Sequence, residues 1–571
     1  MTEIKSKNEY YPYGTSGFRF NENVMIKLSE KIGKAIAYVI ILLNCQSPIK
    51  KNIGVMVTAS HNVYTDNGIK LVDTNGDMID SDMESLMEYI VNNDNVDVSK
   101  YINDNFGIDI NEIIIKYVSD KKVKFLIGND TRRSCKDIIT GIKRGIDSII
   151  DAEYVDLGYR TTPELHILVL KYNEFTPLIA QNEKKSDELI PHKLSSHYLR
   201  FLKYLIFNYE IVLNDVFVDC ANGVGAIAIG RMYYSDLAEY RPNIINYDFD
   251  THRKLNHKSG SDYILNNSQE FHKTLIDGLN QELDTNDVYS DKNIIKVREN
   301  KLHFSFDGDA DRIIMYKFNK NSLDIYDGDH ITSLILLYIL EVLRSKIDTV
   351  ASVGDYNKEI KIGVVHTAYS NGGFIDFVDN IIKTNERINK TFKSFNRPQI
   401  IIDRVCVPTG VKNLIKKANE YNIGIYFEAN GHGSLIVNSN FGLYELIDLG
   451  RIFNTIIGDA IMNMIGIKHI IDKMDLKLDQ LNEIFVKRYS KQVKLTVKDK
   501  SIYKPSHDQT ELIEPKVVAD NIRLIMKEYE GCRAFVRPSG TEDILRLYVE
   551  NNNSGSADLD ALIEKIKSVI Y

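Results

Sequence analysis

The sequence predicts an α/β fold spread over several domains, on three observations. The chain has 571 residues, which is too long for a single hydrophobic core, so we expect three or four domains. Short β-branched runs recur along it, and each is followed by a polar loop and an amphipathic helix, the order typical of parallel α/β layers. Near the C-terminus, expected helices alternate with strands at residues 493–497, 532–536 and 544–549. Because ligands bind beyond the carboxyl ends of such strands, the loops there carry the functional hypotheses.

The composition is that of a soluble globular protein and restricts the class of partner. Hydrophobic residues make up 43% of the chain and charged residues 26%, with a formal net charge of −8. The absence of a long Lys/Arg block argues against nucleic acid or an anionic membrane as a partner. Five scattered cysteines without a C-x-x-C pair favour a reducing compartment, residues 1–13 lack the apolar core of a signal peptide, and residues 32–43 are too short to span a bilayer. We therefore expect a cytoplasmic protein.

The N-terminal region combines a polar loop with a core helix. Residues 14–19 read Gly-Thr-Ser-Gly-Phe-Arg, in which the glycines permit close approach to a ligand and Arg19 can contact phosphate oxygens with its guanidinium fork. Apolar residues then recur at helical spacing over residues 24–43, after Asn23 as the expected N-cap.

Ser60 lies between two short apolar runs, on an expected loop after the strand at residues 53–57. A serine hydroxyl is a weak nucleophile, so chemistry at Ser60 requires a base, a metal or prior phosphorylation. His61 and Lys70 are the nearest candidates for such help. The alternative is an ordinary β-loop-β connection.

Two further strand-loop-helix units follow. Residues 123–127 read as a strand, residues 128–134 as a polar loop, and the segment to about residue 150 as a helix. After a plausible linker at residues 181–196, the strand at residues 216–220 runs into a glycine-bearing turn at residues 221–226. A dinucleotide-binding G-x-G-x-x-G would need glycine at position 228, where Ala228 stands, so a structural strand-to-helix turn is favoured.

Three aspartates, Asp307, Asp309 and Asp311, follow the strand at residues 302–306. Carboxylates at i, i+2 and i+4 of an extended loop project to one side, which is costly without a hard cation and indicates Mg²⁺. An EF-hand is excluded because its glycine position holds Arg312 and its final glutamate position holds Phe318. A solvated acidic turn is the remaining alternative. A phosphorylated Ser60 would supply one further ligand.

A third α/β unit is expected from helices at residues 331–343 and 411–421 and strands at residues 362–365, 400–407 and 423–427. Glu428 and Asn430 follow the last strand and alternate, so a carboxylate and an amide can face one pocket and bind sugar hydroxyls. The alternative is a polar hairpin. Residues 447–470 then read as one long helical segment.

Residues 537–543 lie between the last two expected strands and read Arg-Pro-Ser-Gly-Thr-Glu-Asp. Two hydroxyls, the backbone N–H groups of a glycine turn and Arg537 form a pattern typical of an anion site, and Arg546 follows on the next strand. Phosphate binding is favoured over a plain hairpin turn, which needs fewer donors.

In this order the four loops resemble those of the α-D-phosphohexomutase superfamily, over nearly the whole chain. The Thr-Ala-Ser-His-Asn of residues 58–62 is similar to its phosphoserine loop, and residues 307–312 are similar to its magnesium loop. The Glu-Ala-Asn-Gly-His-Gly of residues 428–433 is similar to its sugar-binding loop, and residues 537–541 to its phosphate-binding loop.

Within the superfamily the chain is most similar to the phosphoacetylglucosamine mutase family, since Asn430 replaces a serine typical of glucose and mannose phosphomutases. This resemblance implies interconversion of N-acetylglucosamine 6-phosphate and 1-phosphate for UDP-N-acetylglucosamine synthesis. It also implies four domains around a central cleft, three related mixed α/β sheet domains and a C-terminal α+β domain, which we place at residues 1–190, 191–326, 327–455 and 456–571.

The resemblance implies roles for particular residues. Phosphorylated Ser60 would act through a 1,6-bisphosphate intermediate. Lys70 is expected as general acid or base with a depressed pKa, and His61, Arg19 and Arg312 as further catalytic residues. One Mg²⁺ would be held by Ser60, Asp307, Asp309 and Asp311. The implied substrate-binding residues are Thr409, Gly410, Glu428, Asn430, Gly431, His432, Arg537, Ser539, Gly540, Thr541 and Arg546.

Val63 stands where the superfamily usually has proline and Asn129 where arginine is common, and neither change removes a reacting group. The Asn-Gly-Gly-Phe of residues 371–374 is also less typical after the Thr-Ala-Tyr of residues 367–369. Two alternatives remain for the function, a phosphoglucomutase or phosphomannomutase, and a catalytically silent paralogue that binds sugar phosphates. In each case we expect a small-molecule sugar phosphate as the ligand and a monomer or weak homodimer.

Overall fold

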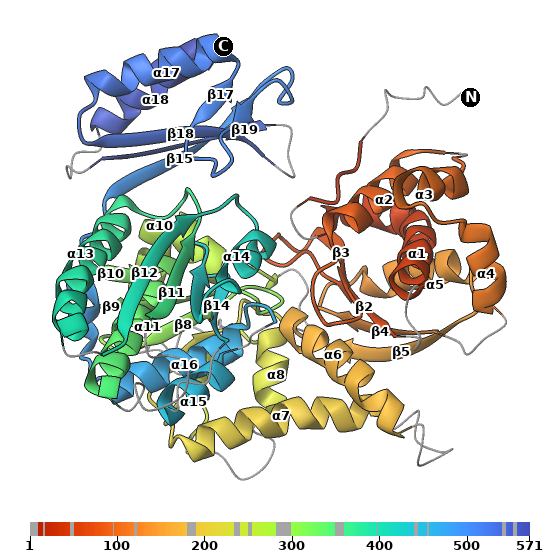
Figure 1. The fold of residues 1–571 in the computed structure, drawn as a ribbon, viewed down its shortest axis with the longest axis horizontal. Helices are drawn as coiled ribbons and strands as arrows, with labels where there is room; N and C mark the ends of the chain where they lie inside the picture. Colours follow the sequence, from red (N-terminus) through yellow and green to blue (C-terminus); the bar gives the residue numbers. More distant parts are fainter. Residues whose placement is uncertain are drawn as a thin grey trace. The chain divides into compact units, whose positions relative to one another are not determined.

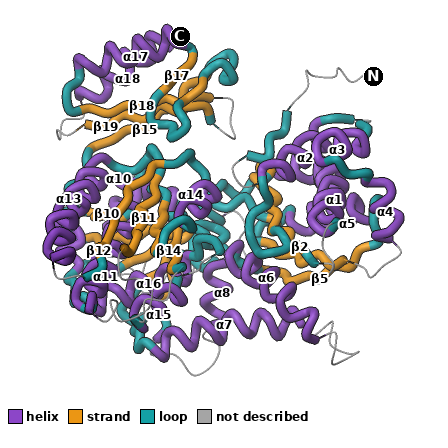
Figure 2. Tube along the Cα trace, in the orientation of Figure 1, coloured by secondary structure: helices purple, strands orange, loops and turns teal. Residues whose placement is uncertain are grey.

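The computed structural model divides into two compact units. Figure 1 labels their helices and strands, and Figure 2 colours the chain by secondary structure. Unit 1 holds residues 1–271, 277–297 and 305–311, and unit 2 holds residues 272–276, 298–304 and 312–571. The structure describes residues 10–14, 17–45, 51–94, 96–118, 123–179, 190–232, 240–248, 254–280, 298–348, 359–394, 397–438, 443–453, 456–539, 544–551 and 557–570.

The first part of unit 1 is a five-stranded mixed sheet with the strand order β1-β3-β2-β4-β5. The pairs β1–β3 and β3–β2 are antiparallel, whereas β2–β4 and β4–β5 are parallel. The strands are β1 (Phe18–Asn21), β2 (Ile53–Val57), β3 (Asp66–Val72), β4 (Val123–Asn129) and β5 (Ala152–Tyr159).

Helices cover both faces of this sheet because its strands are apolar on both sides. One core joins β2, β3 and β4 to α1, α2 and α5, and a second core joins the opposite face to α6. The predicted α/β layer is therefore confirmed. The helices of this region are α1 (Glu22–Asn44), α2 (Ser81–Asn92), α3 (Val98–Phe106), α4 (Ile110–Val118), α5 (Cys135–Asp147) and α6 (Thr162–Ile179).

The start of α1 differs from the sequence prediction. The helix begins at Glu22 and is capped by Asn21, whose side-chain oxygen accepts a hydrogen bond from the Asn23 backbone N–H. Asn23 already has helical geometry, and Asn21 ends β1, so the strand passes directly into the helix. Sequence spacing did not resolve which asparagine accepts the bond.

The second part of unit 1 holds α7 (Ile190–Asn208), β6 (Phe217–Asp219), α8 (Val224–Met232), β7 (Asn243–Ile245) and α9 (Ser261–Asn266). The division between the units passes through α10 (Ser268–Asn280) and β8 (His303–Phe306). The expected linker at residues 181–196 is helical from Ile190 onward, and its residues 181–189 lie outside the described residues.

The glycine-bearing turn between β6 and α8 is structural. Ala221 and Asn222 have positive φ values of 53° and 55°, and the Val224 N–H donates to the Gly308 carbonyl at 3.1 Å. Asp219, at the end of β6, accepts hydrogen bonds from the Ala221 N–H and the Ser305 hydroxyl. This turn therefore packs against the loop that carries the three aspartates, and its polar groups form hydrogen bonds within the protein.

Unit 2 contains a four-stranded sheet with the order β12-β11-β13-β14, in which only β13–β14 is antiparallel. The region from β9 to α16 comprises β9 (Ile313–Phe318), β10 (Leu323–Tyr326), α11 (Gly328–Ser345), β11 (Glu359–His366), α13 (Gly372–Ser394), β12 (Gln399–Cys406), α14 (Val411–Ala418), β13 (Ile423–Phe427), β14 (Gly433–Val437), α15 (Tyr444–Ile452) and α16 (Ala460–Lys473).

The expected single helix over residues 447–470 was wrong, because the segment forms α15 and α16. Asp459 begins the second helix: its carboxylate accepts the backbone N–H groups of Ile461 and Met462. Gly458 precedes this cap and packs closely on His432, where a Cβ atom would lie 2.6 Å from the imidazole. Tertiary contacts thus separate two helices that share a continuous apolar pattern.

The C-terminal part of unit 2 is an antiparallel sheet, β15-β19-β18, with α17 and α18 over one face (Figure 1). Together with the mixed sheets above, it confirms the predicted fold class. Its elements are the 3₁₀ helix η5 (Leu478–Glu483), β15 (Tyr489–Thr496), β16 (Lys504–Pro505), β17 (Leu512–Glu514), α17 (Lys516–Glu528), β18 (Cys532–Pro538), β19 (Ile544–Asn551) and α18 (Ala557–Ile570).

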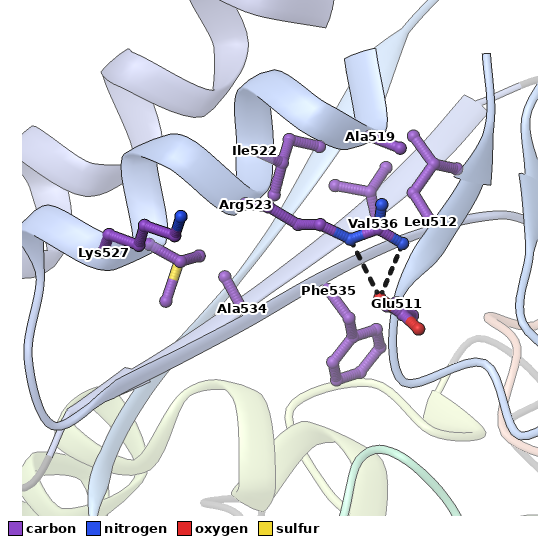
Figure 3. A pocket seen from close by; sticks show the side chains of 10 residues that line it. Glu511, Leu512, Ala519, Ile522, Arg523, Lys527, Ala534, Phe535 and Val536 are labelled. Carbon is purple, nitrogen blue, oxygen red and sulfur yellow. Dashed lines mark hydrogen bonds and ion pairs between the residues drawn. The ribbon is translucent and has the colours of Figure 1, made fainter. Parts of the chain in front are cut away.

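A cavity of about 340 Å³ lies under α17, beside β17 and β18 (Figure 3). Arg523 and Glu511 form an ion pair there at 3.0 Å, and apolar side chains such as Ile522 and Val536 line the rest. None of the predicted site residues lines this cavity. Within the described part of the chain, no helix has both the length and the apolar character needed to cross a bilayer.

Candidate functional site

Ser60 lies on the loop between β2 and β3 in unit 1, as predicted. It is buried and adopts a left-handed backbone conformation, with φ of 53°. Its hydroxyl donates a 2.7 Å hydrogen bond to Oδ2 of Asp307. The predicted phosphoserine and the first predicted metal ligand are therefore in direct contact.

The three predicted metal ligands form one cluster at the end of β8. Asp307, Asp309 and Asp311 are all buried, and each offers one carboxylate oxygen within 4.8 Å of the others. Oδ1 of Asp309 has no hydrogen-bond partner among the described residues. An orphaned, buried carboxylate oxygen in an all-oxygen donor set suits a hard cation such as Mg²⁺, so these residues fit the implied metal.

Lys70 on β3 reaches this cluster. Its ammonium nitrogen lies 2.8 Å from Oδ2 of Asp309 and 2.9 Å from Oδ2 of Asp311. Burial acts to lower the pKa of Lys70, but the negative charges of the two aspartates raise it, and the net direction is upward. Both carboxylates stabilise the ammonium form, so in this structure the pKa of Lys70 shifts in the direction opposite to the one expected beside Mg²⁺.

Thr162 orients Asp309, although nothing in the sequence assigned it a role. Its hydroxyl donates to Oδ2 of Asp309 at 2.6 Å, and its backbone N–H donates to the Asp309 carbonyl at 3.1 Å. Lys70 and Thr162 therefore both use Oδ2, which leaves Oδ1 of Asp309 directed elsewhere. No local pattern in the sequence links the start of α6 to residue 309.

His61 and Arg19 lie beside the Ser60 loop. His61 follows Ser60 in the chain and is half-buried. Arg19 lies on β1, where it pairs with Gly68 of β3, and its guanidinium donates to the side-chain oxygen of Asn62 at 3.4 Å. Its positive charge also acts to lower the pKa of Lys70, which places Arg19 near the same cluster.

The predicted sugar-binding loop lies in unit 2, between β13 and β14. Glu428 is buried, and its two carboxylate oxygens accept hydrogen bonds from the Gly410 N–H at 3.1 Å and the Asn430 amide at 3.3 Å. The oxygen of the Asn430 amide accepts the His432 N–H at 3.0 Å. The structure thus brings the 408–410 loop and the 428–432 loop together around one carboxylate, a convergence that the alternation of Glu428 and Asn430 did not predict.

Arg312 immediately follows Asp311 in the chain and pairs with His432 through one antiparallel bridge. The next residue, Ile313, donates its N–H to the Gly431 carbonyl at 3.2 Å. Gly431 has φ of 87°, and a Cβ atom there would lie 1.8 Å from the Ile313 carbonyl oxygen, so only glycine fits. The predicted sugar-binding loop is consequently held directly against Arg312.

A residue that sequence reasoning missed contacts the same loop. Gln509 belongs to the turn between β16 and β17, and its side-chain oxygen accepts the Thr409 N–H at 3.2 Å. Gln509 itself has a positive φ of 62°. This contact joins the C-terminal region of unit 2 to the predicted sugar-binding residues.

The predicted phosphate-binding loop follows β18 in unit 2. Arg537 and Arg546 lie directly opposite each other on β18 and β19. Like charges directly opposite are destabilising in a sheet, and a bound anion would relieve this repulsion. The Ser539 N–H donates a hydrogen bond to the Ile544 carbonyl at 2.9 Å. Gly540 and Thr541 lie outside the described residues.

Two further side chains support this loop and were not predicted. Tyr369 accepts a hydrogen bond from Nε of Arg537 at 3.1 Å through its hydroxyl, and the guanidinium lies 5.1 Å from the centre of its ring. The Lys500 ammonium donates to the Ser539 carbonyl at 3.1 Å, which adds a third cation to the site. Tyr369 follows β11 and Lys500 follows β15, so folding brings these two contacts to the loop from distant parts of the chain.

The aromatic face around Tyr369 also anchors the loop. Tyr369 packs edge-on against Phe535 and Tyr548, on the face of the C-terminal sheet opposite α17 and α18. A few residues further along, the Gly372 N–H donates to both oxygens of the buried Glu550. The loop after β11 therefore packs against β18 and β19, the two strands that flank the predicted phosphate-binding loop.

Three family models match the chain in separate segments. "Phosphoglucomutase/phosphomannomutase, alpha/beta/alpha domain I" matches residues 35–97, "Phosphoacetylglucosamine mutase AMG1, domain III" matches residues 327–476, and the phosphoglucomutase/phosphomannomutase C-terminal domain matches residues 493–565. Each segment contains at least one of the loops described above.

Full-length relatives give the same result. The phosphoacetylglucosamine mutase of Candida albicans is 30% identical, with 97% of this chain and 95% of that protein covered. The phosphoacetylglucosamine mutase of Homo sapiens is also 30% identical, with coverage of 96% and 91%.

Solved structures agree with this result. An N-acetylglucosamine-phosphate mutase in its product complex is 28% identical, with a TM-score of 0.75 and coverage of 100% and 98%. The N-acetylphosphoglucosamine mutase of Aspergillus fumigatus, in complex with GlcNAc-6P and magnesium, is 25% identical, with a TM-score of 0.75 and coverage of 98% and 96%. A variant of that protein has been solved with glucose 1,6-bisphosphate, at 26% identity, a TM-score of 0.75 and coverage of 99% and 96%. On the identity and coverage of its full-length relatives, this chain belongs to the phosphoacetylglucosamine mutase family of the α-D-phosphohexomutase superfamily.

Proposed function

We propose that this protein interconverts N-acetylglucosamine 6-phosphate and N-acetylglucosamine 1-phosphate, through a phosphoserine at Ser60 and a 1,6-bisphosphate intermediate, for UDP-N-acetylglucosamine synthesis. The observation that carries the proposal is the 2.7 Å hydrogen bond between the Ser60 hydroxyl and Asp307, inside a buried cluster of three aspartates. A family relative solved with GlcNAc-6P and magnesium supports the choice of substrate.

The reaction consists of two phosphoryl transfers, the first from phosphorylated Ser60 to the sugar and the second from the sugar back to Ser60. In the first, the bond between phosphorus and Oγ of phosphorylated Ser60 breaks, and a new bond forms to the free C1 or C6 hydroxyl of the sugar, which loses its proton. The bisphosphate then turns over. In the second, the other phosphoryl group returns to Ser60, and the sugar oxygen that is released takes up a proton, so the net change is an isomerisation.

The three aspartates and phosphorylated Ser60 would be the ligands of Mg²⁺. Mg²⁺ bound by these oxygens would neutralise charge on the transferring phosphoryl group, which is the main requirement of such a reaction. The protein's own contribution is to hold three carboxylates in one buried cluster, with Thr162 and Lys70 fixing the rotamer of Asp309.

Lys70, His61, Arg19 and Arg312 supply protons and positive charge in this proposal. Because its pKa is raised, Lys70 is an ammonium and serves as the general acid that protonates the released serine oxygen. His61 accepts the proton of the attacking sugar hydroxyl. Arg19 and Arg312 offset the negative charge of the phosphate groups.

The sugar and the second phosphate are bound by the two loops of unit 2. Glu428 and Asn430 contact adjacent sugar hydroxyls, and Thr409, Gly410, Gly431 and His432 shape the same pocket. Arg537, Ser539, Gly540, Thr541 and Arg546 bind whichever phosphate is not reacting. One set of cations can serve both orientations of the bisphosphate, because phosphate is recognised by charge and N–H donors alone.

We further propose the division into domains at residues 1–190, 191–326, 327–455 and 456–571, since each segment then carries one of the four loops. The scattered cysteines, which form no disulfide among the described residues, support a cytoplasmic location. A small-molecule sugar phosphate is the partner, and a monomer or weak homodimer the expected state.

The test compares turnover of N-acetylglucosamine 6-phosphate with that of glucose 6-phosphate, after activation by catalytic glucose 1,6-bisphosphate. A clear preference for the acetylated sugar is expected, and a preference for glucose 6-phosphate would contradict the substrate assignment. Intact mass before and after phosphatase treatment should differ by about 80 Da, localised to Ser60, for one phosphoryl group. An unmodified Ser60 after incubation with the bisphosphate would exclude the phosphoserine mechanism.

A further inference from the structure

The backbone carbonyls of the Ser60 loop converge on one buried guanidinium. Nη2 of Arg132 donates to the carbonyls of Ser60 at 3.1 Å and Asn62 at 2.8 Å, and Nη1 donates to those of Val63 at 2.5 Å and Asp66 at 2.6 Å. Arg132 is 3% exposed. Four carbonyls within seven residues therefore point at one cation.

A second side chain, distant in sequence, shares two of these carbonyls. The amide nitrogen of Asn256 donates to the carbonyl oxygens of Ser60 at 2.7 Å and Asn62 at 2.9 Å. Each of these two oxygens consequently accepts two hydrogen bonds, one from Arg132 and one from Asn256. A carbonyl oxygen has two lone pairs, so each of these two oxygens accepts as many hydrogen bonds as it can.

The backbone N–H of Ser60 is held by a connected path. It donates to the Thr58 hydroxyl oxygen at 2.9 Å, and that hydroxyl donates to Oδ2 of Asp130 at 2.7 Å. The same carboxylate oxygen accepts Nε of Arg132 at 2.9 Å. A closed ring of hydrogen bonds thus joins both sides of the Ser60 backbone to Arg132.

This ring holds a backbone conformation that serine adopts at a cost. Ser60 has φ of 53°, in the left-handed region, which persists only where the surroundings over-determine it. The carbonyl of Ser60 accepts two hydrogen bonds and its N–H donates one, and these three bonds hold the backbone in this conformation. The direction of the Ser60 side chain follows from this backbone conformation.

The same carbonyl contacts the loop that carries the aspartates. A Cβ atom on Gly308 would lie 2.8 Å from the Ser60 carbonyl oxygen and 2.9 Å from the amide nitrogen of Asn256. Gly308 therefore allows the Asp307 loop to approach the held carbonyl directly. The distance between the Ser60 hydroxyl and Asp307 depends on where this carbonyl is held.

We propose that Arg132 and Asn256 are positioning residues for phosphoryl transfer. They fix the backbone of Ser60 so that its hydroxyl faces the aspartate cluster. The proposal rests on the proposed function, because it assumes that Ser60 carries the transferred group. Both side chains direct their described hydrogen bonds to the Ser60 loop or to Asp130, so losing them should lower the rate of transfer and leave the binding of substrate nearly unchanged.

Three variants test the proposal against one matched control. Arg132→Lys keeps the charge but loses the fork, and Asn256→Gly removes the amide while tolerating the positive φ of 55° at that position. Arg132→Ala leaves space for added guanidinium. The control is Arg133→Lys, since the neighbouring Arg133 is exposed and pairs with Glu22 instead of the Ser60 loop.

The measurements are the incorporation of a phosphoryl group into Ser60 from glucose 1,6-bisphosphate, followed by intact mass, together with kcat, KM and the melting temperature. For Arg132→Lys and Asn256→Gly we expect the rate of incorporation and kcat to fall by about 10- to 100-fold, with KM within about twofold of the wild type. Millimolar guanidinium should restore part of the rate of Arg132→Ala, and methylammonium should not. The control should match the wild type.

The outcomes separate this inference from the proposed function. If the wild type acquires a phosphoryl group on Ser60 and a folded Asn256→Gly variant does so equally fast, the positioning role is overturned and the proposed function stands. A rise in KM with unchanged kcat would also overturn it. If the wild type itself acquires no phosphoryl group, the proposed function fails and the positioning role fails with it.

Discussion

Unit 1 and unit 2 each concentrate charges of one sign, and they compensate these charges differently. In unit 1 the aspartates are buried, and the ammonium of Lys70 and the hydroxyl of Thr162 lie within hydrogen-bond distance of them. In unit 2, Arg537 lies opposite Arg546, and its described contacts are a phenol oxygen and a carbonyl, which carry no net charge.

The difference follows from burial. A buried charge without a partner destabilises the folded state strongly, so the Lys70 ammonium beside Asp309 and Asp311 stabilises unit 1. Arg537 and Arg546 are half-buried and keep contact with water, which screens their repulsion. Unit 1 thus places a protein cation beside two of its three aspartates, whereas the described contacts of Arg537 in unit 2 carry no net charge.

The largest expected effect comes from removing the reacting hydroxyl in unit 1. Ser60→Ala should lower mutase activity by at least about 10³-fold, because no other group carries the phosphoryl. Steady-state assays and the melting temperature check this, and the fold should remain intact. Ser29→Ala serves as control, since the Ser29 hydroxyl is also buried but bonds within its own helix. Activity retained in Ser60→Ala would refute the mechanism.

The internal compensation in unit 1 is broken by Lys70→Met. This change leaves Asp309 and Asp311 without their cation, and we expect the free energy of unfolding to fall by about 3 to 5 kcal/mol. Denaturant unfolding measures it, with Lys27→Met on the exposed face of α1 as control. Added Mg²⁺ should restore part of the loss. A loss below about 1 kcal/mol without metal would show that the aspartates are compensated in another way.

Acid should affect unit 2 through its buried histidines. Burial lowers the pKa of His303 and of His366 to about 4. Because each folded-state pKa lies below the unfolded value of about 6.5, the unfolded state binds the proton first. Stability is therefore full above pH 6.5 and falls as the pH drops toward 4, by about 2 kcal/mol per histidine at pH 5.

Replacing one of these histidines tests the assignment. His303 stacks on Tyr316 at 4.8 Å between ring centres, so His303→Phe keeps an aromatic ring in the same place. Its free energy of unfolding should change less between pH 7.5 and pH 5 than that of the wild type. Equal slopes for the two proteins would show that His303 is not responsible.

The smallest effect is expected from relieving the like-charge pair in unit 2. Arg546→Met should raise KM for the sugar phosphate by about 10- to 100-fold, since a charge-assisted hydrogen bond to phosphate is lost. Its melting temperature without ligand should stay the same or rise, opposite to Lys70→Met. Arg523→Met, which removes an exposed arginine in an ion pair with Glu511, is the control. A clear loss of stability in Arg546→Met would contradict the comparison.

Local sequence pattern was sufficient to predict the strands that precede the functional loops and the chemical character of those loops. The strands at residues 53–57 and 423–427 have the predicted bounds, because buried β-branched runs and turn residues are short-range signals. The contact between Ser60 and Asp307 was anticipated from residue type and resemblance, and the structure places the two side chains in contact.

Folding alone decided which partners these groups have. The pKa of Lys70 rises because two carboxylates more than 230 residues away meet its ammonium, and the roles of Arg132, Asn256 and Thr162 depend on similar long-range contacts. The separation of α15 from α16 and the choice of Asn21 as a cap also arise from tertiary packing. Residue type limits what a side chain can do, whereas its charge state and direction depend on neighbours that the chain order does not reveal.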